Sequence, residues 1–204
     1  MKRNKETYNM KFKIVDNFYT KPNVMRELAM KTAYEDVSKM NYPGIQSKLS
    51  FTSRSLEKKF EDILDEKLVI DPKRATFGKF RVMMNEKYIF KAHVDGLTYY
   101  TALIYMNRAA DCHGGTAFYR HRESGLEGPL PLSEVKRRGF KDNEEMFEKL
   151  IGDDKFDPAK WEMTDFVEMK FNRLVVFEGF NYFHTHTSSF AVSYTHLRAH
   201  ETRH

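Results

Sequence analysis

Cysteine is almost missing from this 204-residue sequence, which contains only Cys112. A single thiol excludes an internal disulfide and a zinc site built from several cysteines, and it is typical of a reducing compartment. Long apolar runs are missing too, since no window approaches the roughly 18 apolar residues that a membrane-spanning helix needs. Residues 1–5 are basic, but Glu6 and the polar residues after it interrupt any signal-peptide core. We therefore expect a cytoplasmic protein with no membrane association.

A strong excess of one charge is also missing. The 34 basic and 29 acidic residues give a net charge of +5, and both signs are spread along the whole chain. The basic residues at 136–138, for example, are followed by Glu144 and Glu145. No recognisable nucleic-acid-reading motif accompanies the charge. The pattern predicts a mixed surface, and we do not expect a nucleic acid partner.

The apolar residues that are present suffice for one core, because 41% of the side chains are hydrophobic and 14% are aromatic. Alternation in residues 11–15 predicts an opening strand. Helical spacing predicts a helix from Pro22, with Val24, Leu28 and Ala29 on one face, and a second helix over residues 56–68. The second helix has Ser53 and Ser55 as alternative N-caps.

From Phe77 onward the chain is rich in short aromatic and β-branched segments that predict a sheet. Glycines, prolines and charged residues then predict a partly helical insert at about 121–165, with a helix at 143–150. Strand character returns after the insert, so some strands of the sheet precede the insert in the sequence and others follow it. The predicted strands are 80–84, 88–90, 99–105, 116–119, 166–170, 173–177 and a segment around 182–184. Helices and strands in this order predict an α+β fold.

The residues best suited to bind a metal ion are His93 and Asp95. Residues i and i+2 of a strand share a face, so these two side chains can present a nitrogen and an oxygen to one ion. A 2-histidine-1-carboxylate triad would leave open positions for other ligands on a ferrous ion. The third ligand should come from a later strand that returns beside the first, and the run from 172 to 184 ends in His184. His186 lies two residues further along the chain. It is the competing choice, either as the third ligand or as a residue that contacts and orients a ligand.

The run from 93 to 118 resembles the prolyl-4-hydroxylase-like branch of the Fe(II)- and 2-oxoglutarate-dependent oxygenases. The resemblance consists of His-x-Asp at 93–95, a strand ending in Tyr-Met-Asn at 105–107, and Gly-Gly-x-x-Phe at 114–118. It covers about 77–120 and 166–190. Within that branch, the chain is similar to small oxygenases of bacteria and their phages.

The resemblance implies a double-stranded β-helix, or jelly-roll, core with the N-terminal helices packed on one sheet. It implies a dioxygenase that uses Fe(II) and the cosubstrate 2-oxoglutarate, with ascorbate as an optional addition, and that releases succinate and CO2. His93, Asp95 and His184 match the metal ligands, and Tyr105 matches a tyrosine that binds 2-oxoglutarate in some relatives. The alternative is that Tyr105 is an ordinary core residue, because the sequence does not determine which face of its strand lines the interior. A peptide or small-molecule substrate is expected, gripped by the insert.

Residues 191–204 do not continue the strand pattern. They resemble a translated sequencing adapter, so we predict one domain over 1–190 followed by a non-native tail. A genuine histidine-rich tail is the alternative. The family's basic residue for the distal carboxylate of 2-oxoglutarate lies beyond the distal histidine, where Arg198 and Arg203 are poor candidates. We therefore expect this chain to bind 2-oxoglutarate weakly.

Two other functional classes fit parts of the pattern. A non-catalytic β-helix module would keep the sheet and bind a ligand without iron. A Zn(II) hydrolase would use the same three ligands with one open position on the metal.

Overall fold

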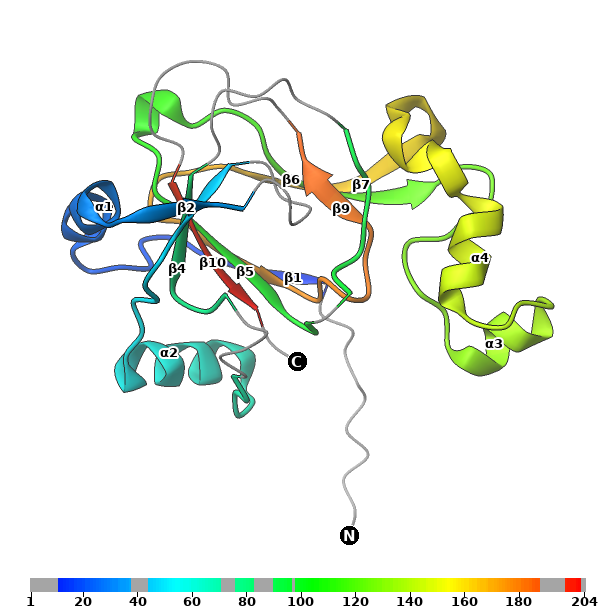
Figure 1. Ribbon diagram of the computed structural model, residues 1–204, viewed down its shortest axis with the longest axis horizontal. Coiled ribbons are helices and arrows are strands. Elements are labelled where there is room, and N and C mark those ends of the chain that lie inside the picture. The colour runs from blue at the N-terminus through cyan, green and yellow to red at the C-terminus, as the bar shows by residue number, and fades with distance from the viewer. Residues whose placement is uncertain are drawn as a thin grey trace, which may run out of the picture.

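A computed structural model describes residues 11–37, 44–70, 76–82, 90–96, 98–187 and 197–202, the last segment by its backbone alone. Its strands form two sheets, and every pairing between neighbouring strands is antiparallel. The larger sheet, called the major sheet here, has the order β1-β8-β5-β10-β4-β3-β2, and the minor sheet has the order β7-β6-β9 (Figure 1). The expected combination of helices and a sheet is therefore confirmed.

The strand bounds are as follows. The major sheet contains β1 (Phe12–Val15), β8 (Leu174–Phe177), β5 (Thr101–Tyr105), β10 (Leu197–Thr202), β4 (Lys79–Val82), β3 (Ile45–Ser47) and β2 (Tyr34–Asp36). The minor sheet contains β7 (Trp161–Glu168), β6 (Gly115–His121) and β9 (His184–His186).

Strands β5 and β8 are buried on both faces, which is why their sequences are continuous apolar runs. One face packs against the minor sheet, where Leu103, Tyr105 and Phe177 meet Phe118 and Val167. The side chains in between point the other way, so that Ala102, Ile104 and Val176 pack beneath the helices. Alternation along each strand thus separates an interior face, between the two sheets, from a helix-covered face.

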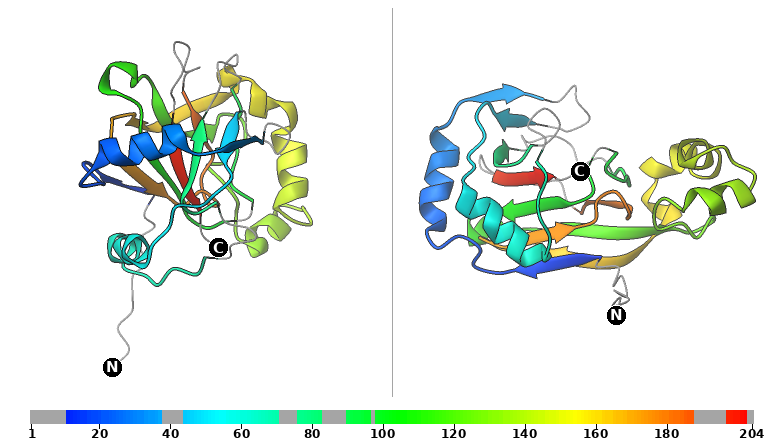
Figure 2. Two further views of the ribbon diagram at one scale, coloured as in Figure 1. Left: turned by 60° about the vertical axis from the view of Figure 1, so that its left-hand side comes forward. Right: turned by 90° about the horizontal axis from the view of Figure 1, so that it is seen from below.

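The helix-covered face lies under α1 (Pro22–Lys31) and α2 (Arg54–Leu64) (Figure 2). The Ser53 side chain accepts a hydrogen bond from the Leu56 N–H, so of the two alternative N-caps the structure selects Ser53. Helix α2 ends earlier than predicted because Asp65 takes a left-handed conformation, with φ at 57°. The helix predicted from Pro22 is confirmed as α1, although Val24 and Leu28 are exposed and Ala29 alone is buried in this helix.

The insert forms α3 (Leu132–Arg137), α4 (Asn143–Leu150) and the 3₁₀ turns η3 (Gly152–Phe156) and η4 (Pro158–Lys160). Its helices lie on the opposite side of the molecule from α1 (Figure 1). Val135, Met146 and Ile151 give it an apolar cluster that continues into Trp161 and Phe183. The predicted helix at 143–150 is confirmed. Strand β7 begins at Trp161 rather than 166, because β6 and β7 pair from Gly115–Glu168 to His121–Trp161, with one β-bulge between Phe118 and Tyr119.

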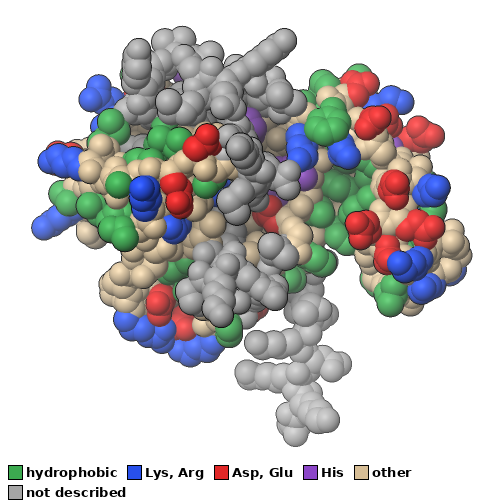
Figure 3. Space-filling model, viewed as in Figure 1, with side chains coloured by type: hydrophobic (Ala, Val, Ile, Leu, Met, Phe, Trp, Pro, Cys, Tyr) green, Lys and Arg blue, Asp and Glu red, His purple; other side chains and the backbone are tan. Residues whose placement is uncertain are grey.

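The face of the molecule drawn in Figure 3 carries both charge signs side by side. In the insert, for instance, Glu134 pairs with Arg137 and Arg138. This agrees with the mixed surface expected from the sequence. Within the described residues, no helix has the length and apolar character required to cross a membrane.

Some predictions fall outside the described residues. Met83 and Met84 of one predicted strand, Tyr88 and Ile89 of another, and residues 188–196 belong to this group. The backbone of residues 197–202 pairs with both β4 and β5 as β10. Because main-chain pairing depends little on which side chains a strand carries, the non-native origin of this segment stays a prediction.

Candidate metal centre

Three side chains converge at one end of the space between the sheets. Ligand atoms of His93, Asp95 and His184 all lie within 4.8 Å of one another, a group that could hold a metal ion. Asp95 Oδ2 is 3.6 Å from His184 Nε2, and Asp95 Oδ1 is 4.0 Å from His93 Nε2. The carboxylate therefore offers one oxygen toward each imidazole. Asp95 and His184 are buried, whereas a third of the His93 side chain remains exposed.

The backbone that carries the pair His93 and Asp95 is less regular than predicted. His93 forms a single β-bridge with His184, through N–H···O contacts of 3.2 and 2.9 Å, and no continuous strand surrounds it. The Asp95 N–H donates to the Gly179 carbonyl at 2.8 Å. Pairing with two later positions of the chain, rather than a strand of its own, thus brings both side chains to one site.

Both imidazoles are oriented by the main chain. His93 Nδ1 lies 2.9 Å from the Lys91 carbonyl, and His184 Nδ1 lies 2.9 Å from the Tyr182 carbonyl. A carbonyl accepts only, so each Nδ1 carries the proton and each Nε2 keeps its lone pair for the site. The His184 ring also packs edge-on against Phe177, with a centroid distance of 4.7 Å. These contacts set both rings in the tautomer that a metal ligand requires.

The Asp95 carboxylate is held from the major sheet. The Thr101 hydroxyl, at the start of β5, donates to Asp95 Oδ2. Gly179 lies so close that a Cβ at that position would be 2.3 Å from the same oxygen and 2.4 Å from Thr101 Oγ1. Sequence reasoning identified neither residue, because glycine after a strand usually indicates only a turn. The centre therefore depends on both sheets: Asp95 is held by the major one and His184 belongs to the minor one.

The electrostatics favour a neutral His93. Its pKa falls from 6.5 to about 4, first because burial disfavours the charged ring and second because His184 lies next to it, while Asp95 acts in the opposite direction. At neutral pH the ring is therefore uncharged. An uncharged imidazole beside a carboxylate is the form that binds a divalent transition metal.

Tyr105 lies on the interior face of β5, the face that also carries Thr101. Its side chain is fully buried, and its hydroxyl is 2.7 Å from Thr116 Oγ1 on β6. The structure thus decides the register that the sequence left open. A role in binding 2-oxoglutarate stays a prediction.

His186 lies at the other end of β9, opposite Thr116, and does not join the group of three. His113 is an exposed loop residue. Of the two glycines in the Gly-Gly turn, Gly114 takes a positive φ of 68°, whereas Gly115 allows a close approach. A Cβ on Gly115 would lie 2.0 Å from the Val167 carbonyl oxygen.

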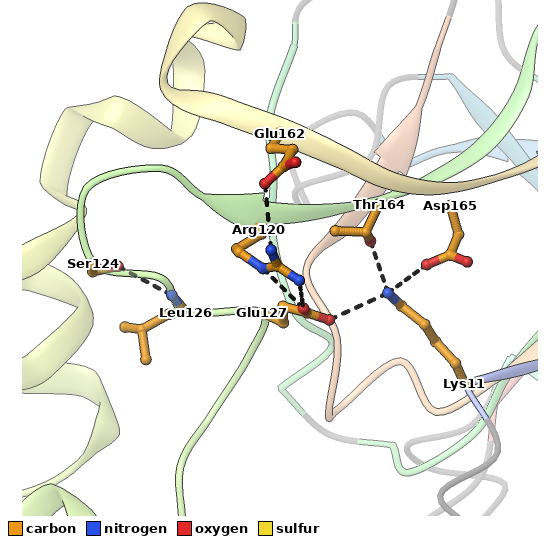
Figure 4. Close-up of polar contacts among 8 residues, drawn as sticks. All are labelled: Lys11, Arg120, Ser124, Leu126, Glu127, Glu162, Thr164 and Asp165. Atoms are coloured by element: carbon orange, nitrogen blue, oxygen red, sulfur yellow. Dashed lines mark hydrogen bonds and ion pairs between the residues drawn. The ribbon is translucent and has the colours of Figure 1, made fainter.

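The residues at the start of the insert are largely occupied by structural contacts. His121 is buried between Ser124 and Asp154, at 2.8 and 3.1 Å. Arg120 pairs with Glu127 and Glu162, and Glu127 also pairs with Lys11 (Figure 4). The Glu127 carbonyl accepts from the N–H of Phe183, the residue before His184. This network therefore supports the strand that carries the distal histidine.

A family model matches residues 4–191, and its description is a family of unknown function, DUF6445. The chain belongs to DUF6445. No curated protein matches this DUF6445 chain. Among solved structures, the selenomethionine-labelled Fe(II)/α-ketoglutarate-dependent dioxygenase TqaL is similar over 94% of the DUF6445 chain and 79% of its own length, with a TM-score of 0.41 and 9% identity. Membership of the prolyl-4-hydroxylase-like branch stays a prediction, so the functional argument rests on the residues of the site.

Proposed function

We propose that this protein is an Fe(II)- and 2-oxoglutarate-dependent dioxygenase that hydroxylates a peptide or a small molecule. The observation that carries the proposal is the convergence of His93, Asp95 and His184 within 4.8 Å. Two imidazole nitrogens and one carboxylate oxygen form the donor set that non-haem Fe(II) oxygenases use, with positions left open for other ligands.

The three residues fit a ferrous ion in protonation state as well as in position. Both Nε2 atoms are available because both Nδ1 atoms face carbonyl oxygens. The low pKa of His93 keeps that ring neutral at physiological pH. Bound there, iron would supply the oxygen activation that is coupled to decarboxylation of 2-oxoglutarate into succinate and CO2. Thr101 and Gly179 would hold the Asp95 carboxylate in place.

The same proposal includes a double-stranded β-helix core. In its favour, the chain alternates between the sheets after His93 and Asp95: β5 is in the major sheet, β6 and β7 in the minor, β8 in the major, β9 in the minor and β10 in the major. The interior cluster of β5, β8, β6 and β7 side chains fills the space between them. This apolar cluster keeps water out of the space between the sheets, while a third of the His93 side chain at the metal centre stays exposed.

Tyr105 is the residue proposed to contact 2-oxoglutarate. It shares the interior face of β5 with Thr101, which touches Asp95. Its hydroxyl already has a hydrogen-bond partner in Thr116, so the pair can present an oriented O–H group. Ascorbate remains an optional addition. The cytoplasmic location also stays a proposal; the single cysteine favours a reducing compartment.

Anaerobic addition of Fe(II) and 2-oxoglutarate tests the function directly. We expect a weak visible charge-transfer band, followed by succinate formation when oxygen is admitted. A protein that binds iron but yields neither signal would contradict the proposal. Tight zinc binding with hydrolytic activity would support the Zn(II) hydrolase instead, and ligand binding without any metal would support a non-catalytic module.

A further inference from the structure

Lys11 directly precedes β1, the edge strand of the major sheet, and its ammonium group reaches across to the minor sheet and the insert. Its Nζ lies 2.6 Å from Asp165 Oδ2, 2.7 Å from Thr164 Oγ1 and 3.3 Å from Glu127 Oε2 (Figure 4). The Lys11 side chain is only 20% exposed, so salt and solvent weaken these contacts less than those of an open surface pair. One lysine thus joins strand β7 to Glu127, near the start of the insert.

Glu127 is held through its carboxylate and contacts the distal-histidine segment through its backbone. Arg120 donates to Oε1 from Nη2 at 2.7 Å and from Nε at 3.0 Å, while Lys11 donates to Oε2. Burial acts to raise the pKa of the Glu127 carboxyl, but Arg120 and Lys11 together lower it, so the carboxylate is ionised at neutral pH. The Glu127 carbonyl accepts from the Phe183 N–H at 2.6 Å. The two cations therefore fix the residue to which the Phe183 N–H is bonded.

Gly128, the next residue, brings the same turn against the main chain of Asn181. A Cβ at residue 128 would lie 1.9 Å from the Asn181 carbonyl oxygen, so the two backbones are in direct contact. Together with the bond from Phe183 to Glu127, this contact packs the first turn of the insert against residues 181–183.

Tyr182 lies between these two contacts and gives Lys11 a second connection to the metal centre. The Lys11 Nζ is 5.2 Å from the centroid of the Tyr182 ring, within the range of a cation–π attraction. The Tyr182 carbonyl accepts from His184 Nδ1 at 2.9 Å. Lys11 therefore reaches the distal histidine both through Tyr182, which orients the imidazole, and through Glu127.

We infer that Lys11 and Glu127 are positioning residues for the metal centre, which keep the His184 imidazole directed at the site through residues 181–183. The inference rests on the metal centre of the proposed function. Strand pairing gives His184 limited support, because β9 pairs with β6 over three residues and residues 178–183 are not in a strand. The contacts made by Lys11 and Glu127 then determine how precisely the ligand nitrogen is placed.

Cobalt(II) binding tests the inference without measuring turnover. The full-length protein is freed of metal and titrated with Co(II), whose visible spectrum depends on the number and arrangement of its ligands. Lys11→Met removes the charge and keeps an apolar side chain, and Glu127→Gln replaces the carboxylate by a neutral amide of similar shape. We expect each variant to bind Co(II) roughly tenfold more weakly and with an altered spectrum, as for residues that orient a metal ligand.

Two comparisons separate positioning from a general loss of stability. In the double variant, the loss of affinity should be smaller than the product of the two single losses, because both residues act on one segment. Lys11→Arg keeps the charge and should restore most of the affinity. Lys170→Met is the matched control, since its ammonium pairs with Asp16 at 2.9 Å at the other end of β1. It should leave the affinity and the spectrum unchanged.

The outcomes decide between the two proposals. Unchanged affinity and spectrum in folded Lys11→Met and Glu127→Gln would overturn the inference, and so would an equal loss in Lys170→Met or independent effects in the double variant. If one of the two variants does not fold, the other decides. A wild type that binds Co(II), but gives neither charge-transfer band nor succinate with Fe(II) and 2-oxoglutarate, would overturn the proposed function and leave the positioning role intact.

Discussion

Gly179 lies directly against the carboxylate of Asp95. A Cβ at residue 179 would be 2.3 Å from Asp95 Oδ2, well inside any real contact distance. The Gly179 carbonyl also accepts the Asp95 N–H at 2.8 Å, so one glycine positions both the backbone and the side chain of the proposed ligand.

The first prediction follows from this contact. Gly179→Ala should displace the Asp95 carboxylate and lower Fe(II) affinity by roughly 10- to 100-fold. This is the range seen when residues that orient a metal ligand are replaced. Anaerobic metal titration measures the effect. Gly96→Ala is the matched control, because a Cβ on that neighbour of Asp95 would meet nothing within 4 Å. An equal loss in both variants would mean that the contact at residue 179 is not the cause.

The choice of ligands gives the second prediction. His93→Ala and Asp95→Ala should each abolish stoichiometric Fe(II) binding, and His184→Ala should do the same, since all three belong to one cluster. His186→Ala should bind iron almost normally, because His186 lies outside it. Metal content after anaerobic loading and gel filtration decides between them. Loss of iron in His186→Ala alone would show that the wrong distal histidine has been assigned.

A third prediction concerns Tyr105. Tyr105→Phe removes the hydroxyl that contacts Thr116, which should weaken 2-oxoglutarate binding by about tenfold and leave iron binding intact. The unfolding free energy should also fall by about 1–3 kcal/mol, because Thr116 Oγ1 loses that partner in a buried site. Thr116→Val should give a similar loss of stability. Unchanged 2-oxoglutarate affinity in Tyr105→Phe would show that the Tyr105 hydroxyl does not bind the cosubstrate.

The pKa of His93 sets a pH dependence of stability. Its value of about 4 in the folded protein lies below its usual value of 6.5, so the unfolded chain binds the proton more readily between these limits. The metal-free protein should therefore lose stability as the pH falls from about 6.5 to about 4. Since a third of the side chain is exposed, we expect a loss of about 1–2 kcal/mol. Urea unfolding at pH 7 and pH 5 measures it, and His93→Gln should show a smaller difference; an unchanged difference would assign the effect to other groups.

Local features of the fold could be predicted well from the sequence. The Ser53 cap and the helix at 143–150 depend on neighbours in the chain, and both are confirmed. The end of α2 could not be predicted, because the left-handed turn at Asp65 is not apparent from the apolar spacing. Nor could the exposure of Val24 and Leu28 on α1, since spacing gives a helical face but not what covers it.

The candidate site could also be predicted only in part from the sequence. His93 and Asp95 could be selected from a short motif, and His184 from a pattern of strand, turn and histidine. Only the tertiary structure decided that His184 rather than His186 joins them, that Thr101 and Gly179 hold the carboxylate, and that Tyr105 lies on the interior face of β5. The physical reason is that ligand type and strand propensity are local properties, whereas a site forms from residues far apart in sequence. Which of them meet depends on the pairing of strands, and a change of one residue in register would turn each of these side chains to the opposite face.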